Sequence, residues 1–223
     1  MKNVVSFSLW GSHPKYWVGA LHNIQIIKNI LPSWVCRFYI DRSCDKSLID
    51  SIKGDNVEVV LFESKDSFHG MFQRFLAADD PEVDIMLSRD CDSRIGSREI
   101  AAINEWLASD KDFHIMRDHP DHGVEVLGGL WSCRNGLLRK FNVTNLINDW
   151  NHFERRGIDQ DFLGQVIYPL IKHTTMEHSE FNIRYANEIR PFPTARVDYE
   201  FVGEIFSENN VREDHWKQIR GIS

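Results

Sequence analysis

The sequence lacks the features that mark membrane-spanning, nucleic-acid-binding and disulfide-stabilised proteins. No apolar run among its 223 residues approaches the ~20 residues needed to span a bilayer, so no membrane span is expected. The formal charge is −7 and the isoelectric point is about 5.8, which argues against a nucleic-acid partner because such surfaces are basic. The four cysteines form no C-x-x-C pair. We therefore expect reduced thiols in a cytoplasmic protein rather than a disulfide or zinc framework.

The order of apolar and polar residues predicts an α/β fold. Runs rich in β-branched and aromatic residues predict strands at residues 4–9, 35–40, 57–62, 83–88 and 113–116. Between the first four, apolar residues recur at helical spacing, as Ile24, Ile27 and Leu31 do before Pro32. This alternation is typical of a mostly parallel central sheet flanked by helices. Because neither an internal repeat nor a low-complexity linker interrupts it, residues 1–223 are expected to form a single domain.

Local patterns predict several element boundaries. A helix is expected around residues 71–76, and a second helix, capped by Ser97, is expected to bury Ile100, Ile103 and Leu107. Further boundaries are predicted for an apolar strand at residues 124–127, a helix at about 137–149, a helix from about 157 that Pro169 limits, and an irregular tail from residue 187.

Two aspartates one residue apart follow the predicted strand at residues 83–88. Residues at i and i+2 of an extended backbone project to the same side, so Asp90 and Asp92 can face one spot while Cys91 turns away. Two carboxylates suit Mg²⁺ or Mn²⁺, with substrate phosphates completing the coordination shell. Arg89 and Arg94 flank the pair, and guanidinium groups bind phosphate well. A polar turn after a buried strand remains the alternative interpretation.

The segment Asp90-Cys91-Asp92 resembles the D-x-D motif of nucleotide-sugar-dependent glycosyltransferases of the GT-A fold. Together with Gly128-Gly129-Leu130-Trp131, the string from Ser88 to Arg94 looks like a group of small viral and bacterial glycosyltransferase-like proteins. The resemblance covers residues 4–206. It implies a nucleotide-binding half at about 1–95, a sugar and acceptor half at about 96–206, and an irregular C-terminal tail.

The resemblance implies a metal-dependent glycosyltransferase. Asp90 and Asp92 would hold Mn²⁺ or Mg²⁺, which would neutralise the charge that develops on a departing nucleoside diphosphate. A histidine near the C-terminus is a third metal ligand in many such enzymes, and His215 is the candidate here. The expected donor is a nucleoside-diphosphate sugar, with UDP favoured over GDP, and the expected acceptor is a glycan or another hydroxyl compound.

A second acidic group, Asp159-Gln160-Asp161, begins a predicted helix. In retaining members of the fold a similar triplet lies beside the transferred sugar, where carboxylates and an amide can bind hydroxyl groups. Asp161 is expected to face the sugar and Asp159 to cap the helix. If the reaction inverts the anomeric centre, one of these aspartates or Asp118 would be the general base.

The remaining candidates are expected to contact the donor, although each could equally be a surface charge or a turn residue. They are Lys15 and Glu63 near strand ends of the first half, Arg74 on the helix before the D-x-D strand, Arg89 and Arg94 beside the motif, and Gly128 and Gly129, which would let the backbone approach the sugar.

Two other functions remain open from the sequence. A nucleotidyltransferase acting on sugar phosphates shares metal-assisted phosphate chemistry, but it would need a glycine-rich basic loop near the N-terminus. The segment Gly11-Ser12-His13-Pro14-Lys15 is poor in both glycine and basic residues. A non-catalytic sugar- or metal-binding module of the same fold would keep the motif without the reaction.

Overall fold

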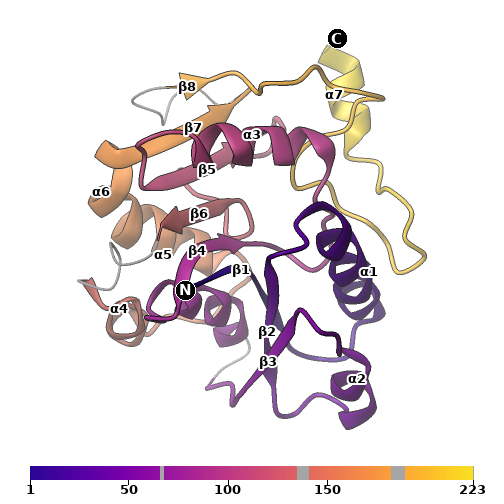
Figure 1. Cartoon of the computed structure of the whole chain (residues 1–223), viewed down its shortest axis with the longest axis vertical. Coiled ribbons are helices and arrows are strands. Elements are labelled where there is room, and N and C mark those ends of the chain that lie inside the picture. Colours follow the sequence, from indigo (N-terminus) through magenta and orange to yellow (C-terminus); the bar gives the residue numbers. More distant parts are fainter. Residues whose placement is uncertain (66–67, 135–140, 182–188, 223) are drawn as a thin grey trace.

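The computed structural model describes residues 1–65, 68–134, 141–181 and 189–222 (Figure 1). The first half of the chain alternates strands and helices: β1 (Lys2–Leu9), α1 (Pro14–Ile30), β2 (Val35–Asp41), α2 (Lys46–Ser51), β3 (Val57–Phe62), the 3₁₀ helix η1 (His69–Ala78), β4 (Val83–Ser88) and α3 (Ser97–Leu107). The second half contains β5 (Phe113–Arg117), β6 (Trp131–Arg134), α4 (Val143–Trp150), α5 (Ile158–Phe162), the π helix η3 (Leu163–Ile167), α6 (Tyr168–Ile171), the 3₁₀ helix η4 (Lys172–Thr174), β7 (Thr175–Ser179), β8 (Ile189–Arg190) and α7 (Trp216–Ile222).

The described residues form one eight-stranded sheet in the order β3-β2-β1-β4-β6-β5-β7-β8. All neighbouring strands are parallel except β6, which is antiparallel to β4 and β5. The mostly parallel α/β sheet predicted from the sequence is therefore confirmed. Strands of both predicted halves belong to this sheet, and the functional division into halves stays a prediction.

Helices cover both faces of the sheet, so most of its strands are buried on both sides. Neighbouring residues of β1 show the alternation. Val4 packs with η1, α4 and the segment from α5 to α6, whereas Val5 packs with α1 and α3 on the other face. The outer strand β3 is the exception, since Val59, Val60 and Leu61 are exposed at the sheet edge. Among the described helices, none is long and apolar enough to cross a membrane.

Several predicted boundaries differ from the structure for identifiable reasons. The helix around residues 71–76 is 3₁₀ rather than α. Gly96 is the N-cap of α3 and Ser97 is its first helical residue. Buried Ala102 and Trp106 join Ile103 in its apolar stripe, whereas Ile100 and Leu107 are only half-buried.

Three predictions for the second half also need correction. Residues 124–127 form a bend rather than a strand, and the strand β6 follows the two glycines instead. The helix predicted at 137–149 is observed as α4, while residues 135–140 lie outside the described residues. Pro169 does not end its helix. The π turn η3 precedes it, and widening the helix there relieves the clash that proline otherwise makes one turn back.

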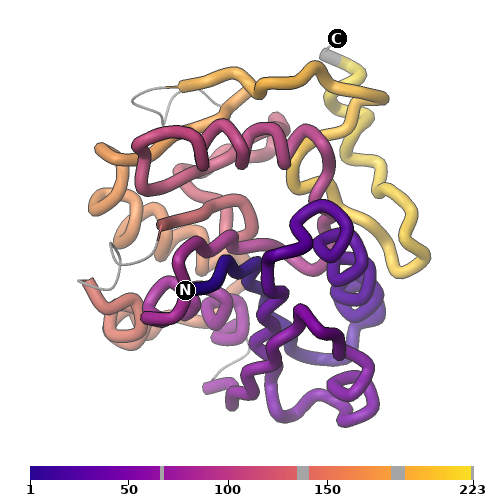
Figure 2. Tube along the Cα trace, viewed as in Figure 1, coloured from indigo at the N-terminus to yellow at the C-terminus, as the bar shows by residue number. Residues whose placement is uncertain are grey.

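The tail predicted to be irregular from residue 187 contains β8 and the helix α7, which the prediction missed, while residues 191–215, here called the C-terminal arm, contain little regular structure. The arm runs from β8 past the N-terminal helix α1 to α7 (Figure 2). It packs on the loop after β4, where the Phe206 amide donates to the Asp92 carbonyl at 2.8 Å and Ile205 forms a bridge with Ser93. This contact brings the distant C-terminal region of the sequence to the D-x-D motif.

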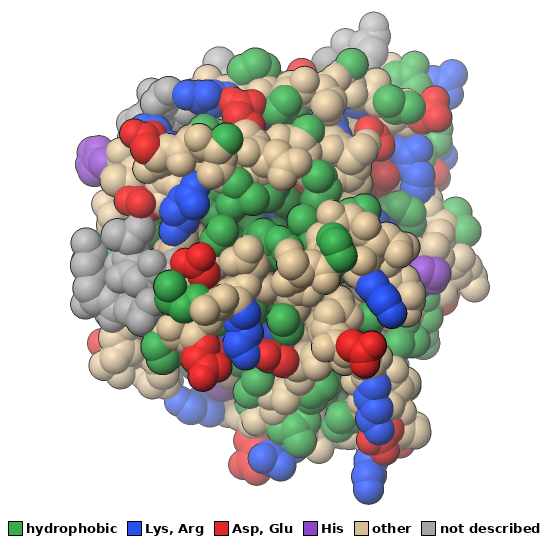
Figure 3. All heavy atoms as spheres, in the orientation of Figure 1, with side chains coloured by type: hydrophobic (Ala, Val, Ile, Leu, Met, Phe, Trp, Pro, Cys, Tyr) green, Lys and Arg blue, Asp and Glu red, His purple; other side chains and the backbone are tan. Residues whose placement is uncertain are grey.

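The surface drawn in Figure 3 mixes acidic and basic side chains. On that face the lysines and arginines do not form a continuous basic patch, in keeping with the net charge of −7.

Candidate active site

A cavity of about 410 Å³ opens at the carboxyl ends of β1 and β4, which is where open α/β sheets bind ligands. Its walls include the end of β1 (Ser8, Leu9, Trp10), the D-x-D loop (Asp90, Cys91, Asp92), the start of α5 (Gly157, Asp159, Gln160) and the C-terminal arm (Gly203, Ile205), and further lining residues come from α1, η1 and the loop before β6. Its volume is within the range that holds a small organic ligand.

Helix α1 holds the backbone of the D-x-D loop. The Asn23 side chain donates to the carbonyls of Cys91 and Ser93 at 3.2 and 2.9 Å. A side chain at Gly19 would collide with the Cys91 carbonyl, so this glycine lets the helix approach the loop. The Cys91 side chain is buried in the core on the α1 side, but residues 91 and 92 form a turn rather than the extended backbone assumed in the prediction. Asp90 and Asp92 both line the cavity.

Arg74 links two carboxylates in what we call the inner ion cluster, Asp90, Arg74 and Asp159. One guanidinium nitrogen pairs with Asp90, and the other lies 3.0 Å from Asp159 Oδ2. The main chain of Arg74 is fixed by β1, because the Ser6 hydroxyl donates to its carbonyl at 2.7 Å and the Ser8 hydroxyl accepts from its amide at 2.9 Å. The arginine and Asp159 are buried, whereas the Asp90 side chain is 48% exposed.

Gly128 and Gly129 make room for the inner ion cluster. A Cβ atom at Gly128 would collide with Asp159 and Arg74, and one at Gly129 would collide with the Asp90 carboxylate. The sequence analysis expected these glycines to let the backbone approach the sugar. The structure gives them a different first role, which is to admit the ion pairs that line the cavity.

Lys15 links two other carboxylates in the outer ion cluster, Asp92, Lys15 and Glu213. Its ammonium lies 3.1 Å from Asp92 Oδ2 and 3.1 Å from Glu213 Oε1. Burial alone would lower the pKa of Lys15, but the two carboxylates outweigh burial and raise that pKa. Glu213 belongs to the C-terminal arm, so this cluster joins the arm to α1 and to the D-x-D loop.

The two clusters leave negative charge uncompensated. Four carboxylates face two cationic side chains, so their formal charges leave two negative charges over. Burial raises the pKa of Asp92, and the charge of Asp90 adds to the shift. Burial also raises the pKa of Asp159 against the opposing effect of Arg74. A divalent cation fits this donor set in both charge and ligand type. The described residues contain no group of three His, Cys, Asp or Glu side chains arranged to bind a metal, so substrate oxygens would complete its coordination.

Neither helix aspartate takes the position predicted for it. Asp159 is buried, lines the cavity and pairs with Arg74. Asp161 points elsewhere and pairs with Arg155, and it does not line the cavity. The N-cap is Gly157, whose φ of 81° suits glycine, and neither aspartate caps the helix. Gln160 lines the cavity beside Asp159.

Several other predicted site residues do not line the cavity: Lys15 and Gly129, which contact its carboxylates from outside, and Arg89, Arg94, Glu63 and His215. Arg89 is fully buried against Glu99 and against the carbonyls of Ser88 and Trp131, so the prediction that it contacts the diphosphate is wrong. Arg94 binds the carbonyls of the D-x-D loop and Asn210 of the arm. Its role is to fix that loop.

Glu63 and His215 are also displaced from the predicted site. Glu63 is exposed beyond the end of β3. The exposed His215 ring lies 3.5 Å from Glu213, so the structure does not join it to Asp90 and Asp92 as a third ligand.

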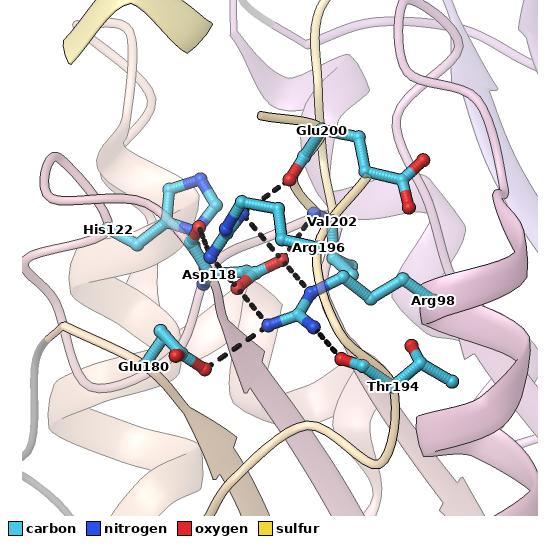
Figure 4. A network of polar contacts seen from close by, with 8 residues as sticks. All are labelled: Arg98, Asp118, His122, Glu180, Thr194, Arg196, Glu200 and Val202. Carbon is cyan, nitrogen blue, oxygen red and sulfur yellow. Dashed lines mark hydrogen bonds and ion pairs between the residues drawn. The ribbon is translucent and has the colours of Figure 1, made fainter. Parts of the chain in front are cut away.

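Asp118 is unsuited to be a general base because its carboxylate is buried and already fully engaged (Figure 4). It accepts from Arg98 at 2.8 and 3.1 Å, from Arg196 at 2.7 Å and from the Val202 amide at 2.9 Å. Arg98 also donates to the Thr194 carbonyl. These bonds fasten the C-terminal arm to β5 and α3.

Several residues that line the cavity were not among the predicted site residues, and three of them have polar side chains of interest: Tyr16, Arg156 and His122. Tyr16 follows Lys15 on α1, and Arg156 precedes the D-Q-D helix, where the pair Arg155-Arg156 was the available signal. His122 also lines the cavity and accepts from the Asp118 amide through Nδ1. Burial, together with His119 and Arg117, lowers the pKa of His122 to about 3, so the ring is neutral at physiological pH with its proton on Nε2.

No family model and no curated protein matches the sequence. The structure, however, is similar to solved glycosyltransferases. The galactosyltransferase LgtC, solved with donor and acceptor sugar analogues, aligns with a TM-score of 0.50 and 12% identity over 79% of this chain and 73% of its own. A glycosyltransferase involved in glycosylation of the major capsid of PBCV-1 gives 0.51 and 12% over 80% and 82%. The mannosyltransferase PcManGT from Pyrobaculum calidifontis, solved with GDP-Man and Mn²⁺, gives 0.52 and 14% over 86% and 57%.

Identities this low show the fold alone. That fold is the GT-A fold expected from the D-x-D resemblance, so the fold prediction is confirmed.

Proposed function

We propose that this chain is a metal-dependent glycosyltransferase that moves a sugar from a nucleoside-diphosphate sugar to a glycan or another hydroxyl acceptor. The observation that carries the proposal is the position of Asp90 and Asp92 at the carboxyl end of β4, in one cavity with Asp159, Gln160 and Arg74. Two of the structural neighbours were solved with sugar-donor ligands, one of them together with Mn²⁺. These ligands support the same chemistry for a cavity of the same fold.

In the proposed reaction, the bond between the sugar and the diphosphate breaks and a bond to the acceptor oxygen forms. A divalent cation bound by Asp90 and Asp92 would neutralise the charge on the leaving diphosphate. Lys15 and Arg156 are the cationic side chains near the cavity that can also reach phosphate oxygens.

Asp159 and Gln160 would bind the donor sugar. A carboxylate accepts hydrogen bonds from hydroxyl groups and an amide both donates and accepts. Arg74 holds Asp159 in place through its guanidinium, so the orientation of this carboxylate is set before substrate arrives. We assign no stereochemistry, because both retaining and inverting reactions fit this arrangement.

A thermal-shift panel tests the proposal. Nucleoside-diphosphate sugars with Mn²⁺ should raise the melting temperature, with UDP-sugars expected to give larger shifts than GDP-sugars, and EDTA should abolish the effect. The best donor should then release its nucleoside diphosphate when incubated with enzyme and acceptor sugars. A response to nucleoside triphosphates with release of pyrophosphate would instead indicate a nucleotidyltransferase. Donor binding without release would indicate a non-catalytic module.

A further inference from the structure

Lys15 occupies an electrostatically unfavourable place. It lies in the first turn of the 17-residue helix α1, where the helix dipole repels cations, and that turn contains no acidic residue. Its side chain is only 15% exposed, so burial adds a further cost. The compensation comes from outside the helix, from Asp92 and Glu213 at 3.1 Å each. The position of this ammonium is therefore explained by the D-x-D loop and the arm rather than by its own helix.

The ammonium contacts a carboxylate that we propose as a metal ligand. The Asp92 side chain is 8% exposed, and its Oδ2 lies 3.1 Å from the Lys15 ammonium. A lysine and a divalent cation at contact distance on one buried carboxylate repel each other strongly. Lysine carries a point charge on a flexible stem, whereas Arg74 grips two carboxylates with a rigid fork. Within the described part of the chain, two basic residues contact the D-x-D carboxylates, and Lys15 is the one whose side chain can change partners.

We propose that Lys15 is an exchangeable counter-ion of the metal site. It neutralises Asp92 and Glu213 until a divalent cation binds Asp92, and it then turns to the diphosphate of the nucleotide. The inference rests on the proposed function and adds to it an order of events. Metal alone must displace the ammonium without a new partner for it, and the nucleotide supplies that partner. Metal and nucleotide therefore bind cooperatively, and each raises the affinity for the other by the same factor.

The test compares Mn²⁺ binding by three variants and the wild type, with and without UDP, followed by the electron paramagnetic resonance of free Mn²⁺. Lys15→Met should bind Mn²⁺ about tenfold more tightly than the wild type in the absence of nucleotide. UDP should raise its Mn²⁺ affinity by a smaller factor than in the wild type, because no ammonium has to be displaced, while coordination of the metal by the diphosphate is retained. Lys15→Arg keeps the charge and should retain weak Mn²⁺ binding.

Arg156→Met is the matched control for net charge. It removes one positive charge from the wall of the cavity, but its guanidinium makes no ion pair with Asp92 among the contacts seen in the described residues. If Arg156→Met tightened Mn²⁺ binding as much as Lys15→Met, general electrostatics would account for the effect and the exchange would be wrong. Circular dichroism spectra and unfolding curves establish that each variant is folded before its affinity is compared.

The outcomes separate this inference from the proposed function. If UDP binding requires Mn²⁺ in the wild type but Lys15→Met binds Mn²⁺ no more tightly, only the exchange is overturned. If neither the wild type nor Lys15→Met binds Mn²⁺, both the exchange and the metal-dependent function fail. Binding by Lys15→Met alone would support the exchange and show that the wild-type lysine blocks the site.

Discussion

The two carboxylates of the D-x-D motif are held by clusters that differ in rigidity. In the inner ion cluster, Arg74 bridges Asp90 and Asp159. Gly128 and Gly129 leave room for these side chains, and two serines of β1 hydrogen-bond to the main chain of Arg74. In the outer ion cluster, Lys15 bridges Asp92 and Glu213, and one of those carboxylates comes from the irregular C-terminal arm. The inner ion cluster therefore holds Asp90 among rigid partners, whereas the outer ion cluster holds Asp92 among partners that can rearrange.

The difference shows how one site can hold fixed partners for the sugar and exchangeable partners for the metal ion and the diphosphate. The donor sugar needs a fixed set of partners, because misplaced groups lose the advantage of orientation. The cation and the diphosphate both carry charge, so when they bind, the cation must replace the Lys15 ammonium as the group that neutralises Asp92. The predictions below disturb the two clusters separately, in order of decreasing effect.

The largest effect is expected when Arg74 is replaced. Arg74→Met leaves Asp159 buried without a cation, so the free energy of unfolding should fall by about 4 kcal/mol in urea titrations. Arg74→Lys restores one charge but cannot grip both carboxylates, and it should recover only part of the loss. Stability unchanged in Arg74→Met would show that the inner ion cluster is not a structural element.

Asp118 should be the next most sensitive position, because it anchors the arm that supplies Glu213. Asp118→Asn removes the charge that pairs with Arg98 and Arg196, and we expect a loss of about 3 kcal/mol. Hydrogen exchange should increase mainly along the arm. Glu180→Gln, which changes a half-exposed partner of Arg98, is the control and should cost less than about 1 kcal/mol. Uniform exchange across the chain would contradict the anchoring role.

Gly129→Ala tests the inner ion cluster with one added methyl group. The new Cβ runs into the Asp90 carboxylate, so Asp90 must move and the chain should lose about 2 kcal/mol of stability. Mn²⁺-dependent UDP binding should weaken at the same time. The matched control is Gly96→Ala, where a Cβ meets no atom within 4 Å. If calorimetry gave the same stability and the same UDP affinity for both variants, the close approach of Gly129 to Asp90 would not matter for the site.

The smallest effect on stability is expected for Asp159→Asn. Burial raises the pKa of Asp159, so the stability that this group contributes is present below its unfolded pKa of about 4 and is lost as pH rises through the higher folded value. At neutral pH the variant should be within about 1 kcal/mol of the wild type, because Arg74 keeps Asp90 as a partner. Urea unfolding at about pH 4 and pH 7 should show a weaker pH dependence than in the wild type.

The sequence predicted the frame of the site better than its side-chain contacts. The strand pattern correctly placed Asp90 and Asp92 just after the carboxyl end of β4, because strand positions depend on local periodicity. Arg74, predicted to contact the donor, does line the cavity, and its contact with a donor stays a prediction. The positions of Asp159 and Asp161 were predicted incorrectly, because Gly157, with its positive φ, caps α5 and sets which aspartate faces the cavity.

The remaining errors concern contacts between distant segments. Arg89 seemed suited to phosphate because it flanks Asp90, but tertiary packing places it on Glu99 instead. Glu213 was not a predicted site residue, and its approach to Lys15 depends on how the C-terminal arm folds back beside α1. Such partners follow from the tertiary fold, which sequence periodicity does not specify.

Calorimetry of UDP binding to the wild type and to Asp92→Asn tests the central claim most directly. Asparagine keeps the size of Asp92 but removes the charge that binds the cation, while the variant should remain folded with a melting temperature close to that of the wild type. If Asp90 and Asp92 hold a metal that bridges the diphosphate, the wild type should bind UDP only with Mn²⁺ or Mg²⁺, and the variant should lose that binding. Unchanged, metal-dependent UDP binding by Asp92→Asn would contradict the account.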